Sequence, residues 1–438
     1  METPRSTKIR RVDPGSYWHR GIGKGKREAL IRDTRDKVIV DINIDGLPLA
    51  KSSGSSLWPI LGKIEQDVFL IGANHGYAKP ADPSEYLQDF IIEGNQILAD
   101  GLEVDGRKVV VEFQKWIFDA PAKSYILNLN THGAYNSCTK CQASGKYDHG
   151  RVYFPEMNAL LRTDEQFVDP QSVYSNRKKG TCALLALTHF KPVSSVCLDY
   201  MHLICLGVVR KILNLLIHGP LKVRFASAIM KSVSDGLCSL QTWVRKEFVR
   251  KPRSLVFLKQ WKATEFRQFL LYSGPVVQLQ IAKQFPRVYQ NFLTLHTACF
   301  ILCSPEMCAN VDAVLYASSL LRVFVADFAE IYGIHFVSHN VHNLIHLAQD
   351  VLKFGCLNNF SAFPFENFLQ MLKKNCASQT NLSNKLPGAM KNKRGFPLKI
   401  WPSQGDNSLL RHFTILITVG PCLRDTAVLS TPSFGFTG

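Results

Sequence analysis

Alternating apolar and polar residues mark the first regular element of the chain. Between Lys37 and Ile44, every second side chain is valine or isoleucine, and the intervening positions include Asp41 and Asn43. A period of two predicts a strand with one apolar face. By similar criteria we expect strands at 57–64, 68–72 and 108–118, and helices at 82–98 and 123–129. This order of strands and helices predicts a mixed α/β core.

Beyond about residue 180 the periodicity becomes helical. After a polar, loop-rich stretch, we expect helices at 198–217, 223–249, 264–285, 289–302, 311–332, 339–354 and 365–374. The pattern divides the chain into a basic arm (1–36), a first core segment (37–137), a loop segment (138–197), a helical insertion (198–335), a segment completing the core (336–400) and a tail (401–438).

Composition narrows the classes of protein that fit this pattern. A chain of 438 residues that is 46% apolar has room for two or three domains and is not wholly disordered. Its net charge of +17 predicts a polyanionic partner, and nucleic acid is the usual one, with a membrane surface as the competitor. We expect no membrane span, because Arg322 and Asp327 interrupt the apolar stretch 313–329. The twelve cysteines do not resemble a disulfide framework and favour a reducing compartment.

Three carboxylates stand at positions where metal ligands often occur. Asp45 and Asp119 each follow a predicted strand, and Glu366 lies at the start of a predicted helix after Pro364. Two Mg²⁺ or Mn²⁺ ions need carboxylates from separate rigid elements. Taken alone, each aspartate is also compatible with a turn or a helix cap, and Asp41 is the fallback for Asp45. We expect Gly46 to allow a bulky ligand to approach the backbone.

Two thiols and two imidazoles have zinc-ligand spacing. Cys138 and Cys141 form a Cys-x-x-Cys pair, and His342 and His346 lie one helical turn apart. Together they would complete a tetrahedral Zn²⁺ site that joins the segment after Asp119 to the segment before Glu366. The alternatives are an ordinary buried cysteine pair with unrelated histidines, or His335 or His339 in place of one ligand. A redox pair is disfavoured, since no strand–Cys-x-x-Cys–helix context is visible.

His202 follows Asp199 by three residues at the start of the insertion. Its imidazole is compatible with three roles: orienting a carboxylate, contacting a scissile phosphate, or filling the core as a hydrogen-bonded histidine.

These motifs together resemble those of the CACTA/EnSpm-type DDE transposases and their animal relatives. The resemblance spans about 37–374 and depends on Ile44-Asp45-Gly46, Phe118–Ala122, the thiol pair, Asp199-x-x-His202 and Pro364-Phe365-Glu366. It implies a ribonuclease-H-like fold interrupted by a helical insertion, with Asp45, Asp119 and Glu366 as the catalytic triad. The zinc ligand set is similar to that of Transib transposases and the V(D)J recombinase catalytic subunit.

The resemblance implies metal-dependent cleavage of double-stranded DNA at transposon ends, followed by strand transfer, in the nucleus. A homodimer is compatible with it. The second hypothesis is a domesticated or decayed DNA-binding or chromatin-associated protein that no longer catalyses. Candidate phosphate contacts are Lys373, Lys374, Lys391, Lys393, Arg394 and the basic run Arg245, Lys246, Arg250, Lys251, Arg253, Lys259 and Lys262.

Overall fold

The computed structural model describes residues 9–23, 35–49, 54–169, 178, 180–244 and 248–383, without the side chains of 375 and 377–383. The predicted tail and the basic residues Lys391, Lys393 and Arg394 lie outside this part of the chain.

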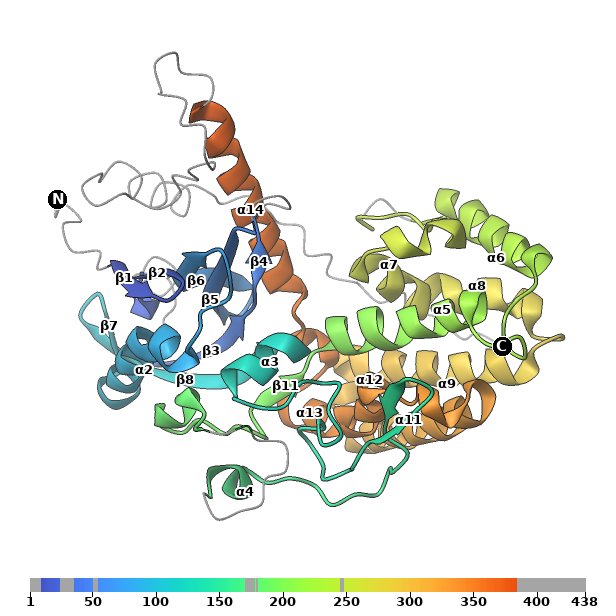
Figure 1. Ribbon diagram of the computed structural model, residues 1–438, viewed down its shortest axis with the longest axis horizontal. Coiled ribbons are helices and arrows are strands. Elements are labelled where there is room, and N and C mark those ends of the chain that lie inside the picture. The colour runs from blue at the N-terminus through green and yellow to red at the C-terminus, as the bar shows by residue number, and fades with distance from the viewer. Residues whose placement is uncertain are drawn as a thin grey trace.

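A mixed sheet forms the first half of the molecule (Figure 1). Its main strand order is β1-β2-β6-β5-β3-β8-β11, in which β3, β8 and β11 are mutually parallel neighbours and the other pairs are antiparallel. The bounds are β1 Ile9–Val12, β2 Gly15–His19, β3 Lys37–Ile44, β5 Ser56–Ile64, β6 Asp67–Gly76, β8 Arg107–Phe118 and β11 Val196–Leu198; in addition, β4 (Leu47–Pro48) pairs with β5, and β7 (Leu102–Val104) pairs with β8. The α/β class and the strands expected at 37–44, 57–64, 68–72 and 108–118 are confirmed.

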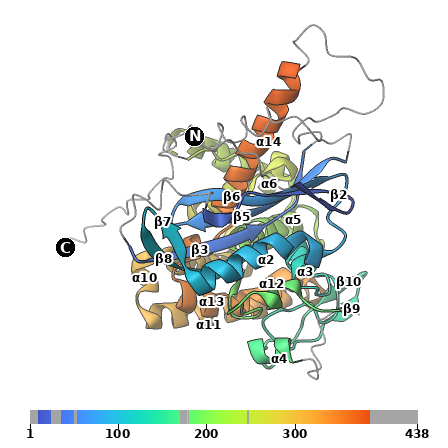
Figure 2. The same cartoon turned by 90° about the vertical axis from the view of Figure 1, so that its left-hand side faces the viewer.

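Helices cover both faces of this sheet (Figure 2). On one face, α2 (Pro83–Asp100) packs against the valine and isoleucine side of β3, with Tyr86, Leu87 and Phe90 fully buried. On the other face, apolar residues of β5, β6 and β8 share a core with α14 (Phe363–Ser383) and with η2 (Met201–Val209), a π-helical segment. The polar residues that follow β3 and β8 therefore lie at the carboxyl ends of these strands, between helices from both halves of the chain.

The described part of the expected basic arm instead continues the sheet. Residues 9–19 form the β1–β2 hairpin, and β2 pairs with β6. Val12 and Tyr17 are fully buried, and Arg10 pairs with Asp89 of α2 at 3.0 Å. The high density of arginine hid a short apolar alternation that is sufficient for a hairpin.

The insertion is helical, as expected, but more broken than its periodicity predicted. Its elements are η2, α5 (Arg210–His218), α6 (Ser227–Ser239), η3 (Leu240–Thr242), η4 (Leu255–Gln260), α7 (Ala263–Gln268), η5 (Phe269–Ser273), α8 (Gly274–Gln278), η6 (Leu279–Ile281), α9 (Pro286–Cys303), α10 (Pro305–Cys308) and α11 (Val311–Tyr332). The helix expected at 311–332 is confirmed. The helix expected at 223–249 is shorter, with α6 ending at Ser239, and the one expected at 264–285 is divided into α7, η5, α8 and η6, with Gly274 inside it.

The elements between 119 and 186, and those after 333, are short, apart from α14. They are α3 (Ala120–Ile126), the hairpin β9 (Lys146–Asp148) and β10 (Arg151–Tyr153), α4 (Asp164–Val168), η1 (Ala183–Ala186), η7 (Ile334–Phe336), α12 (His339–Asn343), η8 (Leu344–His346), α13 (Leu347–Phe354) and η9 (Leu357–Phe360). The single helix expected at 339–354 is thus three consecutive helical segments.

One helical stretch of the described chain, Met201–His218, has the length and apolarity of a membrane span, which the sequence analysis did not anticipate. A core helix passes the same test. Met201, Ile204, Cys205 and Val208 of this stretch are buried inside the protein core. Its hydrophobicity is therefore explained by packing.

The fallback carboxylate, Asp41, does not join the other acids. Its two oxygens lie 2.8 Å from Lys115 Nζ and 3.2 Å from Lys63 Nζ, and all three side chains are nearly buried. Asp41 is therefore shared between two lysines within the sheet and is a structural residue.

Asp41→Ala should destabilise the protein by about 3–5 kcal/mol, because it leaves two poorly solvated ammonium groups without their shared carboxylate. Glu112→Ala is the control: Glu112 pairs with Lys37 at 2.6 Å, but both side chains are well exposed. Its loss should cost about 0–1 kcal/mol. Urea unfolding of both variants would measure the difference, and equal midpoints would contradict this role for Asp41.

Candidate functional site

Parallel pairing brings two predicted carboxylates together. In the register of β3 with β8, Asn43 lies opposite Ile117, so the residues that follow the two strands emerge side by side. Those residues are Asp45 and Asp119. The order of the strands in the sheet, and not their distance in sequence, therefore sets this part of the site.

A histidine from the insertion completes the same cluster. Asp45, Asp119 and His202 each offer a ligand atom, and these three atoms lie within 4.8 Å of one another. Glu366, in the first turn of α14, is not part of that group, but its negative charge is close enough to act on Asp45. All four predicted residues of the carboxylate site thus come from separate elements and face one region.

Each aspartate also has a local structural role. Asp119 Oδ1 accepts a hydrogen bond from Ala122 N at 2.7 Å and caps α3, while Asp45 Oδ1 accepts from Gly46 N at 2.7 Å. The cap and the cluster are compatible, because a carboxylate has a second oxygen.

Gly46 has a structural reason that the sequence did not show. A Cβ at this position would lie 2.8 Å from Cζ2 of Trp58, so packing of the indole against the backbone favours glycine here. Ligand access at Gly46 stays a prediction.

The charges of the cluster shift the acidity of its members. Burial, followed by the charges of Asp119 and Glu366, raises the pKa of Asp45 to about 8. Burial alone would lower the pKa of His202, but its hydrogen bond with Asp199 and the surrounding negative charges raise it to about 9. Without a metal ion, the cluster therefore retains protons that a bound cation would displace.

These pKa values predict how the metal-free protein responds to pH. Both pKa values are higher in the folded protein than in the unfolded chain, whose ordinary values are 3.8 for Asp45 and 6.5 for His202. The folded state therefore binds more protons, and its stability falls as pH rises, through about 8 for Asp45 and about 9 for His202. Tm measured without divalent cations should fall from about pH 6 to about pH 9, and Asp45→Asn should reduce the slope. An equal slope in wild type and variant would contradict the shift at Asp45.

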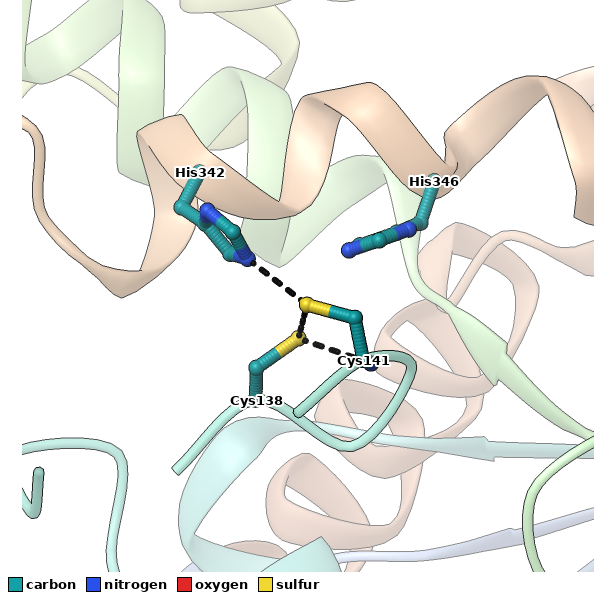
Figure 3. A group of neighbouring side chains, drawn as sticks. All are labelled: Cys138, Cys141, His342 and His346. Atoms are coloured by element: carbon teal, nitrogen blue, oxygen red, sulfur yellow. Dashed lines mark hydrogen bonds between the residues drawn. The ribbon is translucent and has the colours of Figure 1, made fainter. Parts of the chain in front are cut away.

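The thiols and imidazoles converge at a second, separate centre (Figure 3). Cys138 and Cys141 come from the loop after α3, His342 from α12 and His346 from η8, and all four side chains are buried. Their ligand atoms lie within 4.8 Å of one another, with Cys141 Sγ 3.6 Å from Cys138 Sγ and 3.3 Å from His342 Nε2. The predicted ligand set is brought together in full.

This geometry fits zinc. A tetrahedron with Zn–S near 2.3 Å and Zn–N near 2.0–2.1 Å has edges of roughly 3.3–3.8 Å, which match both distances. His346 Nε2 is buried and has no protein hydrogen-bond partner, as expected of a nitrogen reserved for a metal. Burial opposes ionisation of Cys138, but its interactions with Cys141, His342 and His346 outweigh burial and lower the pKa of its thiol well below the ordinary value. The cluster could therefore hold a metal such as zinc.

The alternative imidazole ligands lie elsewhere. His335 stacks on His149, with ring centroids 4.4 Å apart, and His339 contacts the rings of His132 and Phe154. Burial lowers the pKa of His339 to about 4, which keeps its ring neutral in the core.

A buried ion pair anchors the thiol loop to the core. Lys140, between the two cysteines, lies 2.7 Å from Asp350 of α13 and donates to the carbonyls of Val193 and Val196. Asp350 in turn accepts from Leu198 N of β11 at 2.8 Å. The thiol loop is thus fixed to β11 and to the helix that follows the histidines, independently of a metal.

Comparison with protein-family models and with curated protein sequences gives no match.

Three residues that support these centres were not recognised as site residues from the sequence. Asp199 follows β11, a strand that the sequence analysis missed, and it binds His202. Its signal was the same as that of the other aspartates, an apolar run ending in Asp. Lys140 and Asp350 gave no local signal, since each is an ordinary surface residue type.

The described part of the basic run is only partly available to a ligand. Arg253 pairs with buried Glu265 at 2.5 Å, and Lys251 donates to the carbonyls of Gln241 and Val244. Arg250, Lys259 and Lys262 are exposed, whereas Arg245 and Lys246 lie outside the described residues.

Proposed function

We propose that this protein is a DDE-type DNA transposase core with a ribonuclease-H-like fold, which cleaves DNA and transfers its strands with the help of Mg²⁺ or Mn²⁺. The observation that carries the proposal is the convergence of Asp45, Asp119 and His202 within 4.8 Å, with the charge of Glu366 acting on Asp45. These groups come from two adjacent parallel strands, the insertion and the helix after it.

The donor chemistry of this centre suits hard cations. Carboxylate oxygens of Asp45, Asp119 and Glu366 are the ligands that Mg²⁺ and Mn²⁺ prefer. Bound there, the ions would supply activation of water and stabilisation of charge on phosphate oxygens. The acids would hold the ions. Burial of Asp45, followed by repulsion from Asp119 and Glu366, raises its pKa to about 8, and a bound cation would offset that repulsion.

His202 is suited to contact the scissile phosphate. Asp199 occupies its Nδ1, and the raised pKa keeps the ring positively charged in the metal-free protein. Nε2 is then the nitrogen left to donate to a phosphate oxygen. His202 would therefore bind and orient DNA, while the carboxylates hold the ions.

The cysteine–histidine centre supports the carboxylate site structurally. Its thiols follow α3, which Asp119 caps, and its imidazoles precede the helix of Glu366. A zinc ion there would fix both segments across the insertion. All four donors are protein side chains, as in structural zinc sites.

The basic character of the chain supports a DNA partner. Lys373 and Lys374 lie two turns beyond Glu366 on α14, and this helix extends away from the sheet in both views (Figures 1 and 2). Lys373 donates to the carbonyl of Pro48, whereas Lys374 is exposed. With the net charge of +17, Lys374 favours backbone phosphate contacts near the acids. We place such a protein in the nucleus, and a homodimer is compatible with the proposal.

The experiment is a plasmid-nicking and strand-transfer assay of the full chain with Mg²⁺, Mn²⁺ or EDTA. The proposal predicts cation-dependent nicks and salt-sensitive DNA binding. Binding without cleavage at any cation concentration would favour the second candidate, a domesticated non-catalytic DNA-binding protein. The same net positive charge supports this candidate, and it predicts that substitution of the three acids has no effect on DNA binding. If the protein neither binds nor cuts DNA, both candidates fail.

A further inference from the structure

Asp199 occupies a position equivalent to those of the first two acids. It follows β11, and the pairing of Leu198 with Phe118 places it beside Asp119 in the sheet. An aspartate thus directly follows each of three adjacent parallel strands. Unlike Asp45 and Asp119, Asp199 has a side chain that is only 1% exposed, so it is not available to a ligand.

Four hydrogen bonds use both oxygens of this carboxylate. Oδ2 lies 2.6 Å from His202 Nδ1 and accepts from His202 N at 2.9 Å. Oδ1 accepts from Met201 N at 3.2 Å and from Ala362 N at 2.7 Å. One oxygen therefore serves His202, and the other reaches a residue that is distant in sequence.

Ala362 immediately precedes α14. Its carbonyl accepts from Glu366 N at 2.9 Å, so the bond from Asp199 fixes the turn that carries Glu366. The first N–H groups of a helix lack partners within the helix, and a buried carboxylate is a strong acceptor for one of them. Asp199 thus caps, from another element, the helix that returns the chain to the sheet after the insertion.

We infer that Asp199 is a positioning residue that holds the imidazole of His202 and the first turn of the Glu366 helix in register with Asp119. Oδ2 accepts hydrogen bonds from His202, and Oδ1 accepts the hydrogen bond from Ala362. The inference depends on the proposed function only for its effect on cleavage. The positioning itself is a property of the fold.

Two substitutions test the roles of the two oxygens of Asp199 separately. Asp199→Asn keeps an oxygen for Met201 and Ala362, but places an NH₂ group against the N–H of His202. Ala362→Pro removes the donor at the helix start and leaves the Asp199–His202 contact unchanged. Proline is tolerated in the first turn of a helix, and Ser361 before it is already extended, with φ −94° and ψ 146°. Ala362→Ser, which retains the N–H, is the matched control.

The experiment uses the full chain with three readouts. Hydrogen exchange by mass spectrometry reports on the first turn of α14, and ¹⁵N-histidine NMR, assigned with His202→Gln, reports on the ring. DNA cleavage is the third. Asp199→Asn should change the ring signal with exchange unaltered, and Ala362→Pro should speed exchange with the ring unaltered. Each should slow cleavage by about 10–100-fold, as loss of supporting contacts typically does, and Ala362→Ser should match wild type.

An unchanged ring signal in Asp199→Asn, or unchanged exchange in Ala362→Pro, would overturn the inference. A change of both signals in either variant would indicate general unfolding and would also count against it. If wild type does not cleave DNA, the proposed function fails, while exchange and NMR still decide whether Asp199 positions both elements.

Discussion

Asp119→Asn should lower the rate of the proposed Mg²⁺-dependent DNA cleavage by about 10³-fold or more, because the variant loses a charge that would hold the cations that stabilise the transition state. The structure indicates that this substitution removes the charge without removing the helix cap. Asparagine keeps the oxygen that accepts from Ala122 N, so α3 retains its cap. Glu366→Gln should have a similar effect. Single-turnover cleavage rates at saturating protein would measure both, with circular dichroism to verify the fold.

The control for this experiment is Asp105→Asn. Asp105 is exposed in the turn between β7 and β8, with φ 52°, a backbone conformation that asparagine also adopts. It removes the same charge at a site far along the strand from the cluster. If Asp119→Asn and Asp105→Asn cut DNA equally well, the carboxylates are not catalytic. Retained DNA binding in both variants would separate loss of chemistry from loss of affinity.

The carboxylate site could be predicted because short-range signals mark its parts. Asp45 and Asp119 each follow a strand whose apolar residues are evident from the sequence, and parallel neighbours end at one edge. The alternation also placed Asp41 on the polar face, but it could not show that two lysines from neighbouring strands neutralise it. Side-chain pairing across a sheet depends on register, which one strand's pattern does not contain.

The missed elements share a different cause. β11 has only three residues, too few to show a period, and its pairing with β8 depends on contacts between distant parts of the chain. The β1–β2 hairpin was hidden by its arginines, one of which pairs with Asp89 on α2. In both cases tertiary packing determines a structure that local composition does not favour.

Cysteine and histidine chemistry allowed a longer-range prediction. Cys138 and His342 are far apart in sequence, yet their spacing motifs implied one tetrahedral site, and the structure brings the four side chains together. The supporting pair of Lys140 and Asp350 could not be anticipated, because buried lysine and aspartate have no sequence signature. Ligand chemistry is thus more readable from sequence than the contacts that support it.

The second large effect concerns this centre. Cys138→Ser should abolish tight zinc binding and destabilise the protein by more than the roughly 4–5 kcal/mol that marks an exceptional single substitution. Zinc binding to a folded site adds directly to folding free energy, and here the ligands join two segments separated by the insertion. Metal analysis of the purified chain and thermal melting with and without a chelator would measure both effects.

Cys238→Ser provides the matched control, because Cys238 is an exposed free thiol on α6 and is not part of the cluster. It should retain one zinc per chain and unfold like wild type. Cys138→Ser should also lose DNA cleavage at temperatures where it remains folded, since the thiol loop follows the helix capped by Asp119 and the histidines precede that of Glu366. Equal zinc content and equal stability in the two cysteine variants would show that the four side chains are an ordinary buried cluster. Loss of zinc with cleavage retained would instead separate the metal from the positioning of the acids.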